Sequence, residues 1–168
     1  MKVSEIMVTN VYAANENDTV RSVLENFAKF GIGGMPIVND ANVLVGYISD
    51  GDIMRHLGKH LNRPLNYFTM AAEYYSGIGL NSSAGIEYDE LRENLQQVVG
   101  LNVLEVGVKK AITVKENDDI VAVADLLSKR KIKKVPVERD RKLIGIVSRG
   151  DVVRAVVKTF LALNSPEA

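Results

Sequence analysis

The chain has 168 residues, of which 46% are hydrophobic and 25% charged, a composition ordinary for a globular protein. Its 21 Lys and Arg balance 21 Asp and Glu, so net charge does not draw it to nucleic acid or to a membrane surface. The absence of cysteine excludes disulfides and thiolate chemistry, and no secretion signal or bilayer-spanning apolar run is visible, so a cytoplasmic protein is expected.

The sequence contains an internal repeat, in which residues from about 3 to 58 recur at about 103 to 160. Pro36 in GMPIV recurs as Pro136 in KVPVE, and the Asn-Asp pair ahead of the first helix recurs as well. The second copy lacks one residue after its proline, where a loop between two strands would tolerate a deletion. The predicted organisation is a first motif at 1–58, an insertion at 59–102 and a second motif at 103–168.

In the first copy, apolar residues 11–14 predict a short strand, followed by a polar turn that ends at Asp18, a candidate helix cap. A helix is predicted from apolar residues at helical spacing, namely Val20, Val23, Leu24 and Phe27. Two strands at 33–38 and 43–49 follow, and a second helix is expected to begin near Gly51.

The insertion predicts two helices joined by a Gly/Ser-rich joint. The second of them, over 86–99, carries one apolar stripe formed by Ile86, Leu91, Leu95 and Val98 or Val99. Gly100 can close that helix.

In the second copy the same elements are expected: a strand at 111–114, Asp118 as a helix cap, and strands at 133–138 and 143–148. Its helices are predicted from Ile120, Val123, Ala124 and Leu127 and, after Gly150, from Val152, Val153, Val156 and Val157. The order strand, helix, strand, strand, helix therefore occurs twice, which predicts an α/β (α+β) fold. Each copy alone is too small to bury much apolar surface, so the sheets of the two copies are expected to pack together around a pseudo-twofold axis.

Both copies contain an apolar strand that ends in Ser-x-x-Asp: GYISDGD at 46–52 and GIVSRGD at 145–151. With MPIV and VPVE ahead of them, these stretches resemble the cystathionine-β-synthase (CBS) domain pair, also called a Bateman module. The family pattern is a Gly, an apolar pair, Ser or Thr, two variable residues and Asp. It is matched by Gly46, Ile48, Ser49 and Asp52, and by Gly145, Val147, Ser148 and Asp151. The resemblance covers both copies but not the insertion.

The resemblance implies tandem CBS motifs that bind AMP, ADP, ATP or S-adenosylmethionine as a regulatory ligand. No effector domain is recognisable, so the target is either a separate effector protein or lies in the insertion. The resemblance also implies a disc-like homodimer. In that family the Asp accepts hydrogen bonds from both ribose hydroxyls, and the Ser or Thr contacts the ribose or a phosphate. These roles suit the residues, because a carboxylate offers two acceptor oxygens to a vicinal diol. A strand-to-helix turn presents backbone N–H groups and a positive dipole end to a phosphate.

The predicted ligand-binding residues fall into three groups. The polar group, for ribose and phosphate, is Ser49, Asp52, Ser148, Arg149, Asp151, Lys133 and Lys134. The apolar group, for the adenine ring, is Ile32, Met35, Ile132 and Val135 with the adjoining Pro36 and Pro136. The third group offers backbone atoms to the edge of the adenine and is Tyr12, Ala13, Ile112 and Thr113. The copies differ after the serine, with Asp50 in the first and Arg149 in the second, so the second site is expected to favour phosphorylated ligands.

Other interpretations of these features stay open. Ser-x-x-Asp ahead of an apolar helix is also a helix-capping arrangement, and both roles can coexist. A ligand-free dimerisation or interaction scaffold is the second functional hypothesis. An enzyme is the third, but no Ser–His–Asp set, thiol, Walker loop or paired-carboxylate cleft supports it, so no catalytic residue and no required cofactor are predicted.

Two further motifs bear on metal and nucleic-acid binding. His56 and His60 have a helical metal-ligand spacing, but Gly58 between them and the lack of a Glu after His56 favour helix-end histidines, so no metal site is predicted. The basic residues of 129–134 lack interleaved aromatics, which favours phosphate contact by one or two lysines over nucleic-acid binding.

Overall fold

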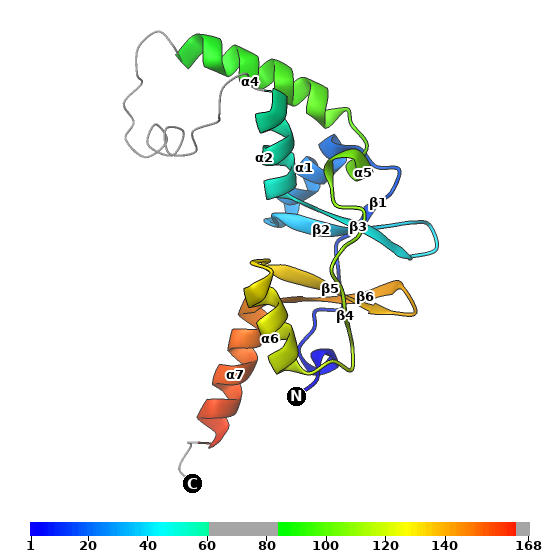
Figure 1. Ribbon diagram of the computed structural model, residues 1–168, viewed down its shortest axis with the longest axis vertical. Helices are drawn as coiled ribbons and strands as arrows, with labels where there is room; N and C mark the ends of the chain where they lie inside the picture. The colour runs from blue at the N-terminus through cyan, green and yellow to red at the C-terminus, as the bar shows by residue number, and fades with distance from the viewer. Residues whose placement is uncertain (61–83, 164–168) are drawn as a thin grey trace. The chain divides into compact units, whose positions relative to one another are not determined.

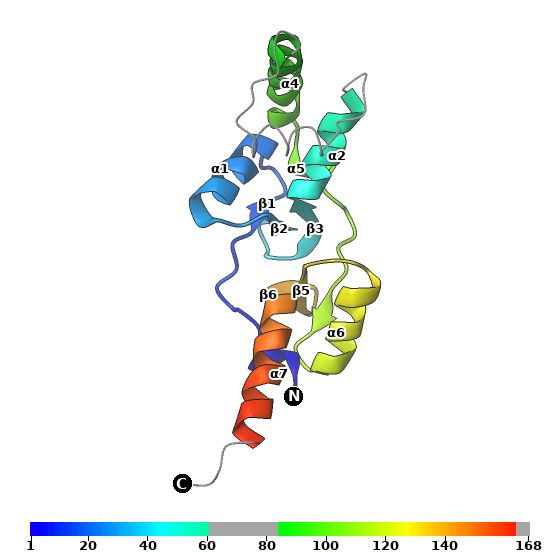
Figure 2. The same cartoon turned by 90° about the vertical axis from the view of Figure 1, so that its left-hand side faces the viewer.

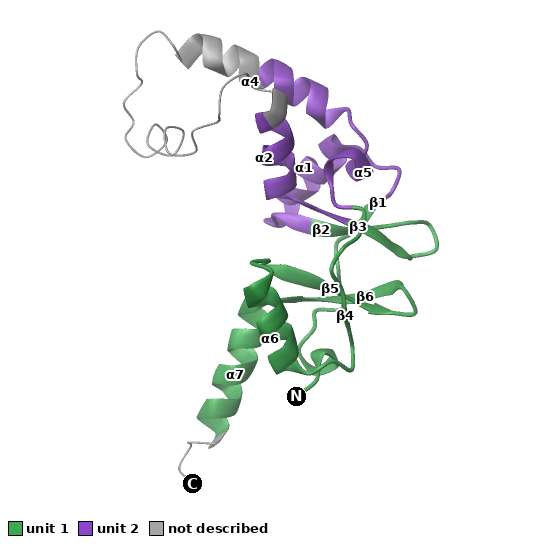
Figure 3. Ribbon diagram, viewed as in Figure 1, with its two compact units in different colours: residues 1–15, 35–46, 109–168 green, residues 16–34, 47–108 purple. Residues whose placement is uncertain are grey.

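The computed structural model describes residues 1–60 and 84–163 (Figure 1). The chain forms two compact units (Figure 3). Unit 1 contains residues 1–15, 35–46 and 109–168, and unit 2 contains residues 16–34 and 47–108. Each unit is therefore assembled from segments that belong to both copies of the repeat.

The elements follow the predicted order twice (Figure 1). The first half comprises η1 (Val3–Glu5), β1 (Ala14–Asn15), α1 (Val20–Phe30), β2 (Gly34–Val38), β3 (Leu44–Ser49) and α2 (Asp50–His60). The second half comprises α4 (Ala84–Val99), α5 (Val103–Val106), β4 (Val114–Lys115), α6 (Ile120–Lys129), β5 (Lys134–Arg139), β6 (Lys142–Ser148) and α7 (Arg149–Leu163). The strands form two three-stranded sheets, ordered β1-β2-β3 and β4-β5-β6. The predicted α+β fold class is confirmed.

The second sheet combines a parallel and an antiparallel pair. β4 runs parallel to β5, with Val114 opposite Val137, and β5 pairs antiparallel with β6 across a bulge after Val137. The β5–β6 hairpin turns on Asp140 and Arg141, whose φ angles of 51° and 66° are both left-handed, as a tight two-residue hairpin turn requires. The residue that the second copy lacks falls at this turn.

Each copy's leading segment pairs with the sheet of the other copy. In unit 1, Val8 and Ile146 of β6 exchange hydrogen bonds of 3.0 and 2.9 Å. In unit 2, Val108 and Tyr47 of β3 exchange bonds of 2.8 and 2.9 Å. The close approach in unit 1 leaves little room at Gly145, because a Cβ there would lie 2.7 Å from the Met7 sulfur and 3.2 Å from the Val8 carbonyl oxygen. This exchange of edge segments is one reason why each unit contains residues of both copies.

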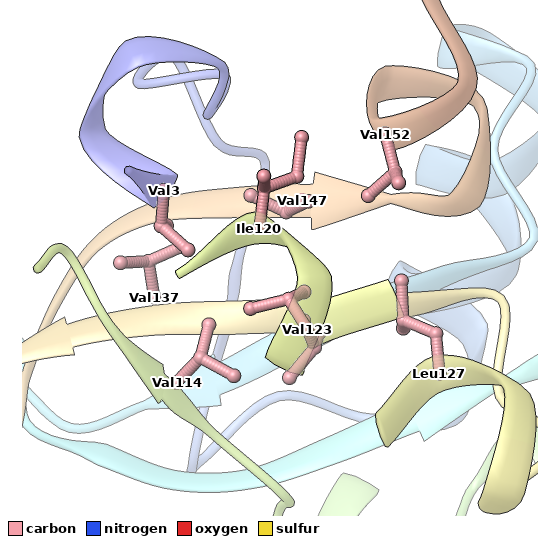
Figure 4. Close-up of a cluster of buried hydrophobic side chains, with 9 residues drawn as sticks. Val3, Val114, Ile120, Val123, Leu127, Val137, Val147 and Val152 are labelled. Carbon is pink, nitrogen blue, oxygen red and sulfur yellow. The ribbon is translucent and has the colours of Figure 1, made fainter. Parts of the chain in front are cut away.

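Helices α6 and α7 cover one sheet of unit 1 with a closely packed core (Figures 2 and 4). The core consists of Val3, Val114, Ile120, Val123, Leu127, Val135, Val137, Val147 and Val152. The predicted stripe of α6 is confirmed, with Ala124 packed at its margin. In unit 2, α1 buries Val20 and Val23, and α4 contacts both α1 and α2. None of the described helices is long and apolar enough to cross a membrane.

Several predicted details are wrong at their boundaries. The strands expected at 11–14 and 111–114 begin only at Ala14 and Val114. Asp118 does not cap α6; its carboxylate accepts a bond of 2.7 Å from Lys115 N and closes the preceding turn. Asp119 is the N-cap instead, and it accepts a 2.8 Å bond from Val121 N. The chain ahead of each helix is thus one residue longer than the sequence suggested.

The first copy and the insertion show further differences. Thr19, and not Asp18, is the N-cap of α1, and its side chain makes no capping bond. The second predicted helix of the insertion is confirmed as α4, which begins two residues before Ile86. Val98 of its stripe is buried, whereas Leu95 is exposed. The first predicted helix of the insertion lies outside the described residues.

Candidate functional site

In the second copy, Ser148 and Asp151 form a closed hydrogen-bonded pair where β6 passes into α7. The Asp151 Oδ2 atom accepts bonds from Ser148 N at 2.7 Å and from Ser148 Oγ at 2.6 Å. Ser148 Oγ in turn accepts a bond of 3.2 Å from Asp151 N. The pair therefore satisfies an otherwise unpaired amide at the start of the helix and fixes the carboxylate in one position.

The first copy has the same arrangement between β3 and α2. Asp52 Oδ2 accepts bonds from Ser49 N at 3.0 Å and Ser49 Oγ at 2.6 Å, and Ser49 Oγ accepts a bond of 3.3 Å from Asp52 N. The capping role proposed for the Ser-x-x-Asp motif is confirmed in both copies. Capping uses one carboxylate oxygen of each aspartate, and the second oxygen has a different partner.

That second oxygen is held by an arginine one helical turn further along. Arg55 Nη1 lies 2.8 Å from Asp52 Oδ1, and Arg154 Nη2 forms the equivalent ion pair with Asp151 Oδ1. The Asp side chains are only 7% and 12% exposed, whereas the arginines are 67% and 73% exposed. These arginines were missed by sequence reasoning, although the repeated Asp-x-x-Arg spacing carries the signal, since residues three apart meet on a helix.

The protonation states near the two sites follow from these contacts. Partial burial, the largest single influence, raises the pKa of Asp151, but the bonds from Ser148 and the Arg154 ion pair together lower it below its usual value. Asp151 is therefore an anion at neutral pH. In unit 2, burial first, and then the charges of Asp50 and Asp52, raise the pKa of Tyr47 to about 12.

The first amides of the two helices have equivalent partners, whereas the second amides do not. Asp50 N donates to the Gly33 carbonyl at 3.0 Å, and Arg149 N donates to that of Lys133 at 3.1 Å. The next amide differs, because Gly51 N donates to Asp50 Oδ1 at 2.7 Å. In the second copy, no described group accepts from the Gly150 amide, since Arg149 takes the place of Asp50 and its side chain offers no acceptor. The first copy thus places its own carboxylate where the second copy leaves an amide available.

The remaining predicted ligand residues have varied surroundings. Tyr12 and Ile112 are exposed, while Ala13, Thr113, Ile32 and Ile132 are half-buried. Lys133 is exposed, and Lys134 is half-buried at the start of β5. Met35, Val135, Pro36 and Pro136 are buried, and Val135 belongs to the core described above. Unit 1 contains every predicted residue except Ile32, Ser49 and Asp52. Their contact with a ligand stays a prediction.

Two shallow hollows lie on unit 1. One, of about 330 Å³ between α6 and α7, is lined in part by Lys131, Arg149 and Val153. The other, of about 420 Å³, is lined in part by Lys109 and Thr113. Arg149 and Thr113 therefore border different hollows.

Within residues 1–58 and 92–162, no group of three or more His, Asp or Glu side chains is placed so that it could hold a metal ion. The side chain of His60 lies outside the described residues, so the interpretation of the His56–His60 pair stays a prediction.

Comparison with known proteins identifies the family. The CBS domain model matches residues 3–59 and 103–158, one match in each copy of the repeat. The chain belongs to the CBS domain family. The uncharacterized protein MJ1426 of Methanocaldococcus jannaschii is 33% identical over 158 residues, which cover 94% of this chain and 92% of MJ1426.

Solved CBS structures share the fold. CBSX2 of Arabidopsis thaliana, crystallised in complex with AMP, superimposes with a TM-score of 0.67 at 23% identity over 95% of this chain and 98% of that one. The CBS domain pair of protein MJ0100, solved with 5′-methylthioadenosine and S-adenosyl-L-methionine, gives a TM-score of 0.63 at 22% identity, with coverages of 95% and 98%. The full CBSX2 sequence is longer, and this chain spans 60% of it.

Proposed function

We propose that this CBS-pair protein is a regulatory module that binds an adenosine-containing ligand and signals its presence to a partner. The observation that carries the proposal is the fixed Ser–Asp pair at the start of α2 and of α7. In each pair one carboxylate oxygen caps the helix, while the other is held only by an exposed arginine. A pre-positioned carboxylate of this kind suits the two hydroxyls of a ribose.

The family relatives support an adenosine ligand in particular. The ligands named for CBSX2 and MJ0100 are AMP, 5′-methylthioadenosine and S-adenosyl-L-methionine, and all three contain adenosine. They differ in charge and in the group attached to the 5′ carbon. The shared ribose and adenine are therefore the part of the ligand proposed for this chain, and AMP, ADP and ATP are the first candidates.

The two copies are proposed to differ in their preference for phosphate. In the first copy the Asp50 carboxylate already occupies the amide of Gly51, so a phosphate would meet a like charge there. In the second copy Arg149 replaces this acid, and the Gly150 amide and the positive end of the α7 dipole favour an anion. The site with Ser148 and Asp151 is therefore proposed as the one for AMP or ATP.

A dimerisation scaffold is the second candidate, and the exposed face of α7 favours it. Val153, Val156 and Val157 are 60%, 57% and 48% exposed and recur at helical spacing on one face. We propose that a homodimer covers this face, whether or not the module binds a ligand. Neither role involves catalysis, and a phosphate-release assay with ATP tests that part of the proposal.

The proposal is tested by calorimetric titration of the purified full chain with AMP, ATP and S-adenosylmethionine. Ligand at about 100 times its Kd should also stabilise the fold by about 2.7 kcal/mol, which a thermal melt detects. Asp151→Ala should abolish most AMP or ATP binding, and Asp52→Ala should spare it.

Ser148→Ala is the matched comparison, because it removes the hydroxyl of the same hydrogen-bonded pair but keeps the carboxylate. Asp151→Ala should weaken binding more than Ser148→Ala, and equal losses would show that the carboxylate makes no contribution beyond that of the intact pair. If millimolar amounts of all three ligands leave both the heat and the melting temperature of the wild-type chain unchanged, the module is not an adenosine sensor.

A further inference from the structure

Asp151 has too few unused lone pairs to bind a ribose in the present arrangement. A carboxylate has about four acceptor positions, two on each oxygen. Oδ2 already accepts from Ser148 N and from Ser148 Oγ, and Oδ1 accepts from Arg154. One position is left, whereas a vicinal diol donates two hydrogen bonds. One of the present donors must leave before both hydroxyls can bind.

Arg154 is the donor that is released at the lowest cost. Its side chain is 73% exposed, and ion pairs with an exposed partner contribute only about 0–1 kcal/mol. The Ser148 donors belong to the cap of α7, so displacing them would also leave a helix amide without its partner. The arginine can move into solvent without disturbing any other bond described for it.

The position of Arg154 also brings its charge to the start of the helix. A Cβ built at Gly150 would lie 3.3 Å from Arg154 Nη1, so the guanidinium curls back over the first turn of α7. In the first copy a Cβ at Gly51 would meet only Ser49, so Arg55, although paired with Asp52, does not approach Gly51 in the same way. A cation at the positive end of a helix dipole is held there by Asp151 against an unfavourable field. An anion bound at this end would relieve that repulsion.

We infer that Arg154 selects phosphorylated nucleosides over uncharged ones, by occupying Asp151 Oδ1 until a ribose displaces it and then pairing with the 5′-phosphate of the ligand. This inference rests on the proposed function of the second site. An uncharged nucleoside displaces the arginine and offers it no new partner. A nucleotide displaces it and supplies a phosphate beside Gly150, which a guanidinium binds with charge-assisted hydrogen bonds.

The test compares the affinities of adenosine, 2′-deoxyadenosine and AMP for the full chain by titration calorimetry, in an Asp52→Ala background so that one site is measured. Arg154→Met keeps the aliphatic stem and removes the charge. We expect adenosine to bind about two- to tenfold more tightly and AMP more weakly, since the variant loses both the competitor and the phosphate partner. The gain should be smaller for 2′-deoxyadenosine, which donates one hydroxyl fewer to the carboxylate.

Lys158→Met is the matched control. It removes one positive charge from α7 four residues beyond Arg154, and the affinity ratio of AMP to adenosine should stay that of the parent chain. Arg154→Lys should restore part of the ratio. The inference is overturned if Arg154→Met changes both affinities by the same factor, or if Lys158→Met changes the ratio equally. If the wild-type chain binds none of these compounds, the proposed function itself fails, and the inference falls with it.

Discussion

The Asp50 carboxylate lies 2.7 Å from the amide of Gly51, at the point where the second copy has Arg149 beside Gly150. An acid at the start of a helix stabilises it through the helix dipole by about 0.3–1 kcal/mol. The same contact fills the place in which a phosphate oxygen would otherwise accept from the backbone. In the first copy, Asp50 therefore stabilises the helix and occupies the Gly51 amide.

Exchanging these charges is expected to move the phosphate preference between the copies. Asp50→Arg should raise the affinity of the first site for AMP and lower the stability of α2 by about 0.3–1 kcal/mol. Arg149→Asp should weaken AMP binding at the second site by about tenfold, the size of one charge-assisted contact. Titration calorimetry on each variant measures its affinity for AMP. Adenosine is the control ligand, and its affinity should change least. An unchanged AMP affinity in both variants would contradict the asymmetry.

The helix caps offer a direct test of the structure. Asp119→Ala removes the bond to Val121 N and should lower the free energy of unfolding by about 1 kcal/mol. Thr19→Ala is the matched control at the start of α1, because the Thr19 side chain makes no capping bond, and it should cost much less. Urea unfolding followed by circular dichroism measures both. Equal losses would show that the two N-caps do not differ as described.

The free energy of unfolding should decrease at acid pH, because Asp151 becomes protonated there. Its pKa is lowered in the folded state, so its stabilising contribution is complete above the unfolded value, about 3.9, and is lost as the pH falls from there towards the folded value. Asp151→Asn removes the charge, so the difference in unfolding free energy between wild type and variant should shrink below about pH 4. Urea titrations between pH 7 and pH 3 measure this difference. A difference that stays constant over that range would contradict the role of the charge.

Tyr47 should titrate later than an ordinary tyrosine. Its pKa is raised to about 12, chiefly by burial and then by Asp50 and Asp52, so the tyrosinate absorbance that is lost in Tyr47→Phe should appear near pH 12. Because the folded pKa lies above the unfolded value of 10.0, the contribution of Tyr47 to stability is complete below pH 10 and is lost as the pH rises towards 12. Asp50→Asn should shift the titration to lower pH. A normal titration near pH 10 would show that the phenol is not buried.

The apolar face of α7 is expected to support a homodimer. Val156→Glu places a charge among Val153 and Val157 and should raise the fraction of monomer measured by light scattering at tens of micromolar protein. Lys158→Glu changes the charge of the neighbouring polar face and serves as the control. A monomeric wild-type chain at that concentration would count against the dimer.

The sequence was sufficient for the features that repeat with a clear period. The apolar stripe of α6 and the Ser-x-x-Asp motif both predicted the observed elements, because burial and capping act over a few neighbouring residues. The choice between Asp118 and Asp119 as the cap was beyond the sequence, since either acid can cap a helix and the length of the preceding turn decides. The pairing of Val8 with the second sheet and of Val108 with the first could not be predicted either, because the sequence of a short apolar segment does not indicate which strand it pairs with.

The candidate site shows the same division. Both aspartates were found from the motif, yet the arginines that hold them lie outside the quoted pattern and need the helix geometry to be connected with it. Met35 and Val135 were chosen as apolar residues beside the strands, and the structure places both in the interior. A strand's alternation tells which residues share a face, but it does not tell which face the ligand meets.

The bond between Val8 and Ile146 has a consequence for synthesis as well as for the finished fold. Val8 and Ile146 lie 138 positions apart in the chain, so this edge of β6 cannot close until both copies of the repeat have been synthesised. Pairings so distant along the chain raise the contact order and slow folding, because the loop must close before the contact contributes any stability. Until then β6 presents an unpaired strand edge, which invites pairing with another nascent chain. Removal of the first eight residues would make that transient exposure permanent in the strand that leads directly into Ser148.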